Sequence, residues 1–211
     1  KAFKLIDAAV EAKVDYVKFQ TFSAIKLVSS LAKKADYQIK NDKSDVLSQF
    51  EMLKNLELSE SDHSKIIDYC NENNIKFFST AFDIDSLKYL HKIGLELVKI
   101  PSGEITNLPY LRAASKLFKK VIISTGMSTM NDINSALNVF LNNGISRNHI
   151  TILHCNTEYP TPMNDVNLLA MLDIGNQFNT SIGYSDHTLG IEIPIAAAAL
   201  GAEILEFHVV F

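Results

Sequence analysis

Two histidines, His187 and His208, follow two successive apolar runs of the chain, in "IGYSDHT" and "ILEFHVV". If both runs are strands of one parallel sheet, their carboxyl ends meet at one edge and the two imidazoles face one cavity. Imidazole nitrogens with open positions around them suit a divalent transition metal. A structural reading stays open, because a histidine at a strand end often bonds to backbone and two ligands fall short of the usual three or four.

Other apolar runs also turn polar at the same end. Lys18 in "YVKFQT" and Lys99 in "VKIPSGE" are cations within such runs, and a buried lysine needs an anion. Nearby serine hydroxyls would help to hold a phosphate and a carboxylate, and Glu104 is a candidate general acid or base. Lys18 could instead pair with Asp15 or with a helix carboxylate. The polar candidates at these strand ends are Lys18, Gln20, Thr80, Lys99, Ser102, Glu104, Ser124, Asn156, Thr157, Tyr159, Ser185 and Glu206.

The remaining histidines and the cysteines indicate no chemistry of their own. His154 lies within an apolar run, where we expect a hydrogen-bonded structural residue. Cys155 beside it is expected to pack in the core, and Cys70 lies on a predicted helix without the surroundings of a reactive thiol. Three histidines fall on predicted helices or helix ends, where we expect surface positions: His63, His91 and His149.

Short β-rich runs alternate with helical patterns, which predicts an α/β fold with a parallel sheet. Ser59 and Asp62 resemble a capping box at a helix start, and Gly94 and Gly144 stand where helix C-caps are expected. We predict strands at residues 16–20, 76–80, 97–100, 121–124, 150–155, 181–184 and 204–209.

This spacing is typical of a (β/α)₈ TIM barrel that lacks its first strand, which would precede Lys1. We therefore interpret residues 1–211 as one barrel domain that is incomplete at both ends and belongs to a longer polypeptide. A doubly wound open sheet is the weaker alternative, because no G-x-G-x-x-G turn follows any strand. The polar stretch "SAIKLVSSLAKKADYQIKNDKSD", within an insertion over residues 22–75, is expected to be disordered or a lid.

Composition excludes several classes of protein. The chain has 211 residues, of which 47% are hydrophobic, enough for a sizeable core. The net charge is −4 and the lysines are scattered, so we expect neither nucleic acid nor a membrane as a partner. The longest apolar run is too short to cross a bilayer. Two cysteines and no visible signal peptide indicate a reduced, cytoplasmic protein.

Taken together, the motifs resemble one known family. "VKFQT", "FFSTAFD", "VKIPSGE", "IISTGM", "LHCNTEYPTP", "IGYSDHT" and "ILEFH" occur in the order typical of the sialic acid (N-acetylneuraminate) synthases, and they cover nearly the whole chain. The resemblance implies a (β/α)₈ barrel that condenses phosphoenolpyruvate with an N-acetylated amino sugar. It also implies a homodimer of the full-length protein and a C-terminal antifreeze-like domain, which we expect to lie outside this segment.

The resemblance assigns roles to the candidates. It implies a manganese or magnesium ion on His187 and His208, with Glu206 as the acid just before the second ligand. Glu104 would lie near the reacting carbons, and Gln20 and Tyr159 near the sugar. Thr157 stands where many relatives that use N-acetylmannosamine have an asparagine, which favours the legionaminate branch and a diacetamido trideoxy sugar. Phosphoenolpyruvate would be held by Lys18, Lys99, Ser102, Ser124 and Ser185.

Two other classes of function remain possible from the residues. The same barrel could be a metal-dependent hydrolase or a pyruvate aldolase, in which Lys99 or Lys18 would form a Schiff base. A non-catalytic sugar-binding barrel is the third class, but it would be expected to have lost the lysines or the histidines, and both are present.

Overall fold

The computed structural model describes residues 1–34 and 48–209. The chain divides into two compact units, one formed mainly by Lys1–Ser86 and the other by Leu87–His208. Residues 35–47 of the predicted insertion lie outside the described residues, and its role as a lid stays a prediction. The described part of the insertion holds helices and an isolated antiparallel bridge between Lys33 and Ser48.

The first unit consists of two neighbouring parallel strands covered by helices. Gln20 of one strand lies opposite Thr80 of the other. Two helices pack on these strands through an apolar cluster that includes Ile6, Ile66 and Cys70. The elements are α1 (Ala2–Glu11), β1 (Tyr16–Thr21), α2 (Ala24–Leu27), α4 (Gln49–Lys54), α5 (Glu60–Glu72) and β2 (Lys76–Ala81).

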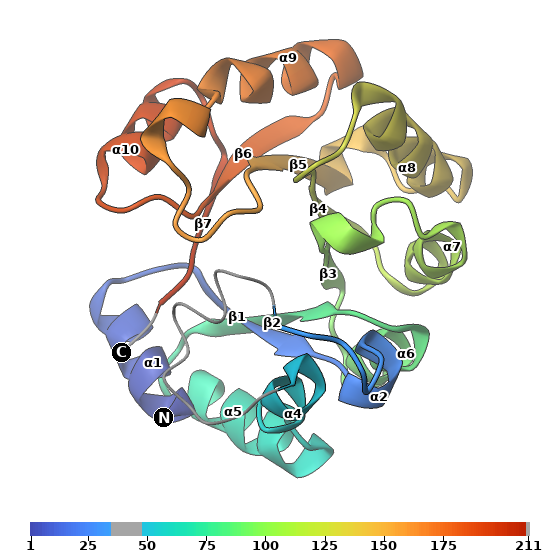
Figure 1. Ribbon diagram of the computed structural model, residues 1–211, viewed down its shortest axis with the longest axis vertical. Helices are drawn as coiled ribbons and strands as arrows, with labels where there is room; N and C mark the ends of the chain where they lie inside the picture. Colours follow the sequence, from blue (N-terminus) through green and yellow to red (C-terminus); the bar gives the residue numbers. More distant parts are fainter. Residues whose placement is uncertain (35–47, 210–211) are drawn as a thin grey trace. The chain divides into compact units, whose positions relative to one another are not determined.

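The second unit is a sheet of five parallel strands joined in chain order. Successive strands pair with each other along the whole sheet, and helices α7 to α10 flank it (Figure 1). Helix α6 (Ile84–Lys92) begins in the first unit and ends in the second. The other elements are β3 (Leu97–Ile100), η1 (Ser102–Glu104), α7 (Leu108–Leu117), β4 (Lys120–Ser124), α8 (Met130–Asn142), η2 (Arg147–His149), β5 (Ile150–Cys155), η3 (Met163–Asp165), α9 (Leu168–Phe178), β6 (Ser181–Asp186), α10 (Glu192–Ala199) and β7 (Ile204–Phe207).

The local signals in the sequence agree with these elements. Ser59 and Asp62 form both bonds of the capping box of α5. Gly94 and Gly144 have φ values of +93° and +89°, the left-handed conformation that glycine adopts at helix ends. The α/β class with parallel strands is confirmed within each unit. Over the described residues 1–34 and 48–209, no helix is both long enough and apolar enough to cross a membrane.

Two strand ends differ from the prediction by two residues, and the other boundaries agree within one residue. Strand β6 continues to Asp186, and β7 stops at Phe207, although the apolar run continues through Val209. His208 therefore lies just beyond the last strand, with Val209 more than half exposed. The apolar run alone does not mark this boundary, because the end of a strand depends on where its neighbour stops offering hydrogen bonds.

Candidate active site

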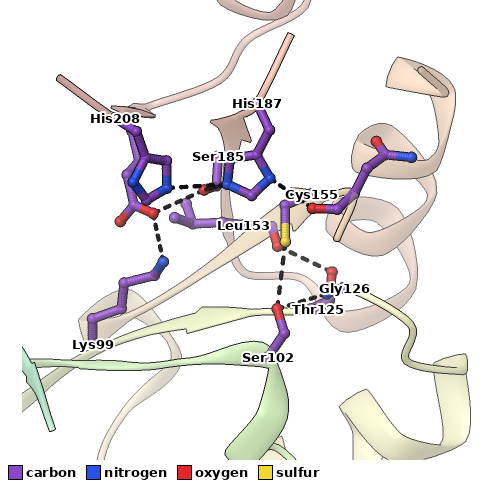
Figure 2. Close-up of polar contacts among 11 residues, drawn as sticks. Lys99, Ser102, Thr125, Gly126, Leu153, Cys155, Ser185, His187 and His208 are labelled. Carbon is purple, nitrogen blue, oxygen red and sulfur yellow. Dashed lines mark hydrogen bonds and ion pairs between the residues drawn. The ribbon is translucent and has the colours of Figure 1, made fainter. Parts of the chain in front are cut away.

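His187 and His208 meet beyond the ends of β6 and β7. The Nε2 atoms of the two imidazoles are 3.1 Å apart (Figure 2). The Nδ1 of His187 lies 2.7 Å from the backbone carbonyl of Asn156, which can only accept, so this nitrogen carries the proton. In the neutral ring, the Nε2 of His187 then offers a lone pair towards His208. Two lone pairs at this distance would repel each other, so a proton or a cation belongs between them.

The geometry of the pair fits a metal ion. Two ligands about 2.1 Å from one octahedral ion, at about 90° to each other, lie about 3.0 Å apart. A backbone carbonyl that fixes the ring of a ligating histidine, as Asn156 does here, is the usual support for such a ligand. Among the described residues, no group of three or more histidine, cysteine, aspartate or glutamate side chains could hold a metal. The remaining positions would therefore go to solvent, substrate or other oxygen atoms.

Burial favours the neutral form of His187. The side chain is 9% exposed, and desolvation is the main reason that its pKa lies below the usual histidine value. The charge of Lys99 acts in the same direction, whereas the Asn156 carbonyl and the carboxylates of Glu206 and Asp186 oppose the shift. A neutral imidazole is the form that binds a metal.

Tyr159 covers the histidine pair from one side. Its ring centroid lies 4.0 Å from that of His187, with the planes tilted by 31°. The same ring meets His208 edge-on at 5.6 Å. Aromatic contacts of this kind restrict the rotation of both imidazoles, and the sequence did not reveal this role for Tyr159.

Lys99 and Glu206 form a buried ion pair next to the histidines. The Nζ of Lys99 lies 2.6 Å from Oε1 of Glu206, and the two side chains are 7% and 9% exposed. Ser185 donates a hydrogen bond of 2.8 Å to the same carboxylate oxygen. The Oγ of Ser185 also lies 3.4 Å from Nε2 of His187, so the ion pair and the histidine pair share this serine (Figure 2). The anion that a buried lysine needs is thus supplied within the protein itself.

Ser102 and Glu104 lie on the short turn η1 after β3. Ser102 Oγ accepts a 2.9 Å hydrogen bond from the backbone N–H of Gly126 and lies 3.4 Å from Sγ of Cys155. A Cβ atom at Gly126 would come within 2.6 Å of Thr157 Cγ2 and 3.0 Å of Ser102 Oγ, so only glycine allows this close approach. The carboxylate of Glu104 accepts a 2.6 Å hydrogen bond from the side chain of Asn107.

Three candidate polar atoms are buried without a hydrogen-bond partner among the described residues: Ser124 Oγ, Asn156 Oδ1 and Thr80 Oγ1. Buried polar groups are normally paired, so such atoms suggest a missing partner such as water or a ligand. Asn156 and Thr157 also line a cavity of about 870 Å³ between α8 and α9.

A comparison with protein families identifies the family of this chain. The model of the NeuB family matches residues 5–211. The chain belongs to the NeuB family. It is 50% identical, over 98% of its length, to the N,N'-diacetyllegionaminic acid synthase of Campylobacter jejuni, and covers 62% of that protein. It is 43% identical over 98% of its length to the synthase of the same name from Legionella pneumophila, of which it covers 58%.

Solved structures give the same result for this NeuB-family chain. The crystal structure of N-acetylneuraminic acid synthetase from Leptospira borgpetersenii matches all of the chain with a TM-score of 0.86 and 31% identity, and the match covers 68% of that protein. The resemblance to sialic acid synthases that the seven motifs indicate is thereby confirmed. The chain spans about 60% of the length of the two curated relatives.

The NeuB-family structure places the predicted site residues in two groups. Five residues of the second unit are linked by the contacts described above, with His208 completing the histidine pair: Lys99, Tyr159, Ser185, His187 and Glu206. Ser102 and Thr157 instead lie close to Gly126. Asn156 joins them through its carbonyl, while Glu104 shares a turn with Ser102. Three others lie on the paired strands of the first unit: Lys18 half-buried, Gln20 exposed and Thr80 buried.

Two expectations about histidines in this NeuB-family chain are wrong. His63 is 1% exposed rather than at the surface, because it faces the strands from α5 and bonds to Thr21. His154 is not fully hydrogen-bonded: its Nε2 is buried without a partner among the described residues. Burial lowers the pKa of His154, against the opposing effect of the Asn167 carbonyl. Nothing local in the sequence indicates these two environments, because Thr21 is distant in sequence from His63 and Asn167 lies in the loop before α9.

Proposed function

We propose that the full-length protein condenses phosphoenolpyruvate with the open-chain aldehyde of an N-acetylated amino sugar, releasing phosphate and forming a nonulosonic acid. The observation that carries this proposal is the facing Nε2 pair of His187 and His208 beside the buried cation of Lys99. One group suits a metal and the other an anion, and the two are linked through Ser185. The relatives named as diacetyllegionaminic acid synthases support the same reaction class.

His187 and His208 would hold a divalent ion, manganese or magnesium. Such an ion supplies Lewis acidity to the aldehyde oxygen of the sugar. His187 is suited to the task because burial keeps it neutral and the Asn156 carbonyl orients its ring. Tyr159 would keep both rings in place and border the sugar.

The phosphate and carboxylate of phosphoenolpyruvate would be held by the lysines and serines. Lys99 supplies positive charge, and the hydroxyl of Ser124, which has no partner among the described residues, donates a hydrogen bond. Ser185 would donate to the ligand once its hydroxyl leaves Glu206. Ser102 presents its hydroxyl from the turn after β3. Lys18 on β1 stays a proposed phosphoenolpyruvate residue from the family resemblance. The incoming anion must compete with Glu206 for Lys99, so Glu206, itself a candidate substrate residue, acts as the internal counterion of the lysine.

The chemical steps require one acid–base group besides these residues. A bond forms between C3 of phosphoenolpyruvate and the aldehyde carbon, and positive charge develops at C2. The aldehyde oxygen becomes an alkoxide in this step. Water then adds at C2, and Glu104 accepts one of its protons and passes it to the alkoxide. The second proton leaves with the phosphate as the C2–O bond to phosphate breaks, and a keto group remains at C2. Glu104 is held for this role by Asn107. Gln20, Thr80, Asn156 and Thr157 would contact the sugar.

The acceptor that we favour is a 2,4-diacetamido-2,4,6-trideoxy hexose. The identity of 50% to a diacetyllegionaminic acid synthase and the threonine at position 157 both support this branch over N-acetylmannosamine. We also infer a complete (β/α)₈ barrel in the full-length protein, because the match to the sialic acid synthetase structure extends over the entire chain. A homodimer and a cytoplasmic location remain predictions from the sequence.

A Schiff-base aldolase fits less well. The lysine of such an aldolase must attack the carbonyl carbon of pyruvate, whereas the Nζ of Lys99 is engaged by the Glu206 carboxylate at 2.6 Å. Borohydride reduction in the presence of pyruvate would trap the adduct of such an aldolase, and we expect none.

The test follows phosphate release from phosphoenolpyruvate by the full-length protein with manganese. N-acetylmannosamine and the diacetamido trideoxy hexose are offered in parallel, each with an EDTA control. We expect EDTA-sensitive release that depends on the diacetamido sugar. Phosphate release that does not depend on a sugar would contradict the proposal. So would the absence of phosphate release with both sugars when the protein is folded and loaded with metal.

A further inference from the structure

A chain of buried hydrogen bonds runs from the strands of the first unit to α5. Thr21 Oγ1, at the end of β1, lies 2.8 Å from Nε2 of His63 and 2.8 Å from Oγ of Ser79 on β2. His63 Nδ1 lies 2.9 Å from the carbonyl of Ser59, the N-cap residue of α5. The exposed fractions of Thr21, His63 and Ser79 are 7%, 1% and 0%.

With a single proton on the ring of His63, the donor of each hydrogen bond in this series is fixed. The Ser59 carbonyl can only accept, so Nδ1 of His63 donates and Nε2 accepts. Thr21 must then donate to His63, which leaves Ser79 as the donor to Thr21. Each hydroxyl orientation is thus set by the imidazole. An apolar residue at position 63 would fill the same space but would leave the two hydroxyls without this fixed partner.

This series of hydrogen bonds lies on the opposite face of the two strands from three candidate substrate residues. Thr21 follows Gln20, and Ser79 precedes Thr80, with Gln20 and Thr80 opposite each other in the strand register. Since side chains alternate along a strand, Gln20 and Thr80 point to the face opposite the one that bonds His63, as does Lys18. Thr80 Oγ1 is buried without a partner among the described residues. A tilt of either strand end would therefore move these groups together.

We propose that His63 is a positioning residue, which through Thr21 and Ser79 fixes the strand ends that present Lys18, Gln20 and Thr80 to the phosphoenolpyruvate and sugar. This inference rests on the proposed function. The ring of Phe77 on β2 meets His63 edge-on, with centroids 6.5 Å apart, and so limits the rotation of the imidazole as well. His63 touches no reacting atom in this role and acts only through the two strands.

The test uses Thr21→Val in the full-length protein, because valine keeps the shape of threonine and removes only the hydroxyl. Thr21→Ser is the conservative variant that restores it. Ser115→Ala is the matched control: Ser115 is 5% exposed on α7, and its hydroxyl donates to the Arg112 carbonyl away from the candidate residues. Phosphoenolpyruvate affinity is measured by titration calorimetry, and KM and kcat by phosphate release.

We expect Thr21→Val to raise the Kd and KM for phosphoenolpyruvate about tenfold with kcat changed less than about twofold, the effect of misplacing a binding group. Thr21→Ser should restore both values, and Ser115→Ala should leave them unchanged. An unchanged Kd in Thr21→Val, or an equal rise in Ser115→Ala, would overturn the positioning role alone. Failure of the wild-type protein to bind phosphoenolpyruvate would instead overturn the proposed function on which it rests.

Discussion

Lys99 and Glu206 come from β3 and β7, 107 residues apart in sequence, and form a 2.6 Å ion pair that excludes water from both groups. A buried pair of this kind gives little net stability, because desolvation of two charges offsets their attraction. Removing one partner is costly, since it leaves the other charge buried and unpaired. Under the proposed function, phosphoenolpyruvate would compete with Glu206 for the positive charge of Lys99.

Replacing Glu206 with glutamine should separate the effect of the ion pair on anion binding from its effect on stability. Without the carboxylate, Lys99 has no internal anion, so the affinity for phosphoenolpyruvate should rise several-fold. The free energy of unfolding should fall by about 3 kcal/mol, as for a broken buried pair. Calorimetric titration and urea denaturation measure the two quantities. Glu96→Gln breaks the exposed pair between Lys119 and Glu96 and should alter neither. Weaker binding of phosphoenolpyruvate by Glu206→Gln would show that Glu206 contacts the substrate.

Gly126 should tolerate no side chain. Gly126→Ala places a methyl group 2.6 Å from Thr157 and 3.0 Å from Ser102, so we expect a loss of about 1–3 kcal/mol in the free energy of unfolding and weaker phosphoenolpyruvate binding. Gly103→Ala is the control, because no heavy atom of the described residues lies within 4 Å of the added carbon. Equal stabilities of the two variants in urea would contradict the close packing around Gly126.

Tyr159 should matter for metal affinity through its ring rather than its hydroxyl. Tyr159→Leu removes the ring contacts with His187 and His208, and we expect manganese to bind about tenfold more weakly, corresponding to the upper range for aromatic contacts. Tyr159→Phe keeps the ring and should bind manganese nearly as the wild type does. Electron paramagnetic resonance of the free manganese ion during a titration gives the dissociation constant of each protein. The same affinity in all three proteins would exclude the ring as a support.

Cys70 should be chemically inert in the folded protein. Burial raises the pKa of its thiol to about 11, so almost no thiolate exists at pH 8. Iodoacetamide should therefore modify Cys70 only after denaturation. The unfolded thiol ionises near pH 9, so the folded state binds more protons between about pH 9 and 11, and stability should fall with rising pH in that window. Cys70→Ala should remove this part of the alkaline loss, and fast alkylation of native protein at pH 8 would refute the prediction.

The sequence predicted the strands well because each is a short apolar run with polar residues after it. Contacts within a few residues were equally readable, as the Ser59–Asp62 capping box shows. The pairing of Lys99 with Glu206 and of His63 with Thr21 could not be read, because each joins strands or helices distant in the chain. His63 has an ordinary helical setting in the sequence, and only the position of α5 over β1 and β2 reveals why it is buried.

The end of β7 is a second feature that the local sequence pattern does not predict. The run "ILEFHVV" is apolar beyond the strand, so its pattern places His208 inside a strand that in fact ends at Phe207. The pairing of His208 with His187 was nevertheless predicted, because both follow successive runs whose carboxyl ends meet at one edge of the sheet. In the structure their Nε2 atoms lie 3.1 Å apart.

The most direct test of the histidine site is a manganese titration of the full-length protein, followed by sugar-dependent phosphate release, for the wild type, His187→Ala, His208→Ala and His91→Ala. His91 lies exposed on α6 and serves as the control. We expect one manganese ion and sugar-dependent release in the wild type and in His91→Ala, and loss of both in the two site variants while they remain folded. Wild-type manganese binding and turnover in either His187→Ala or His208→Ala would contradict the account.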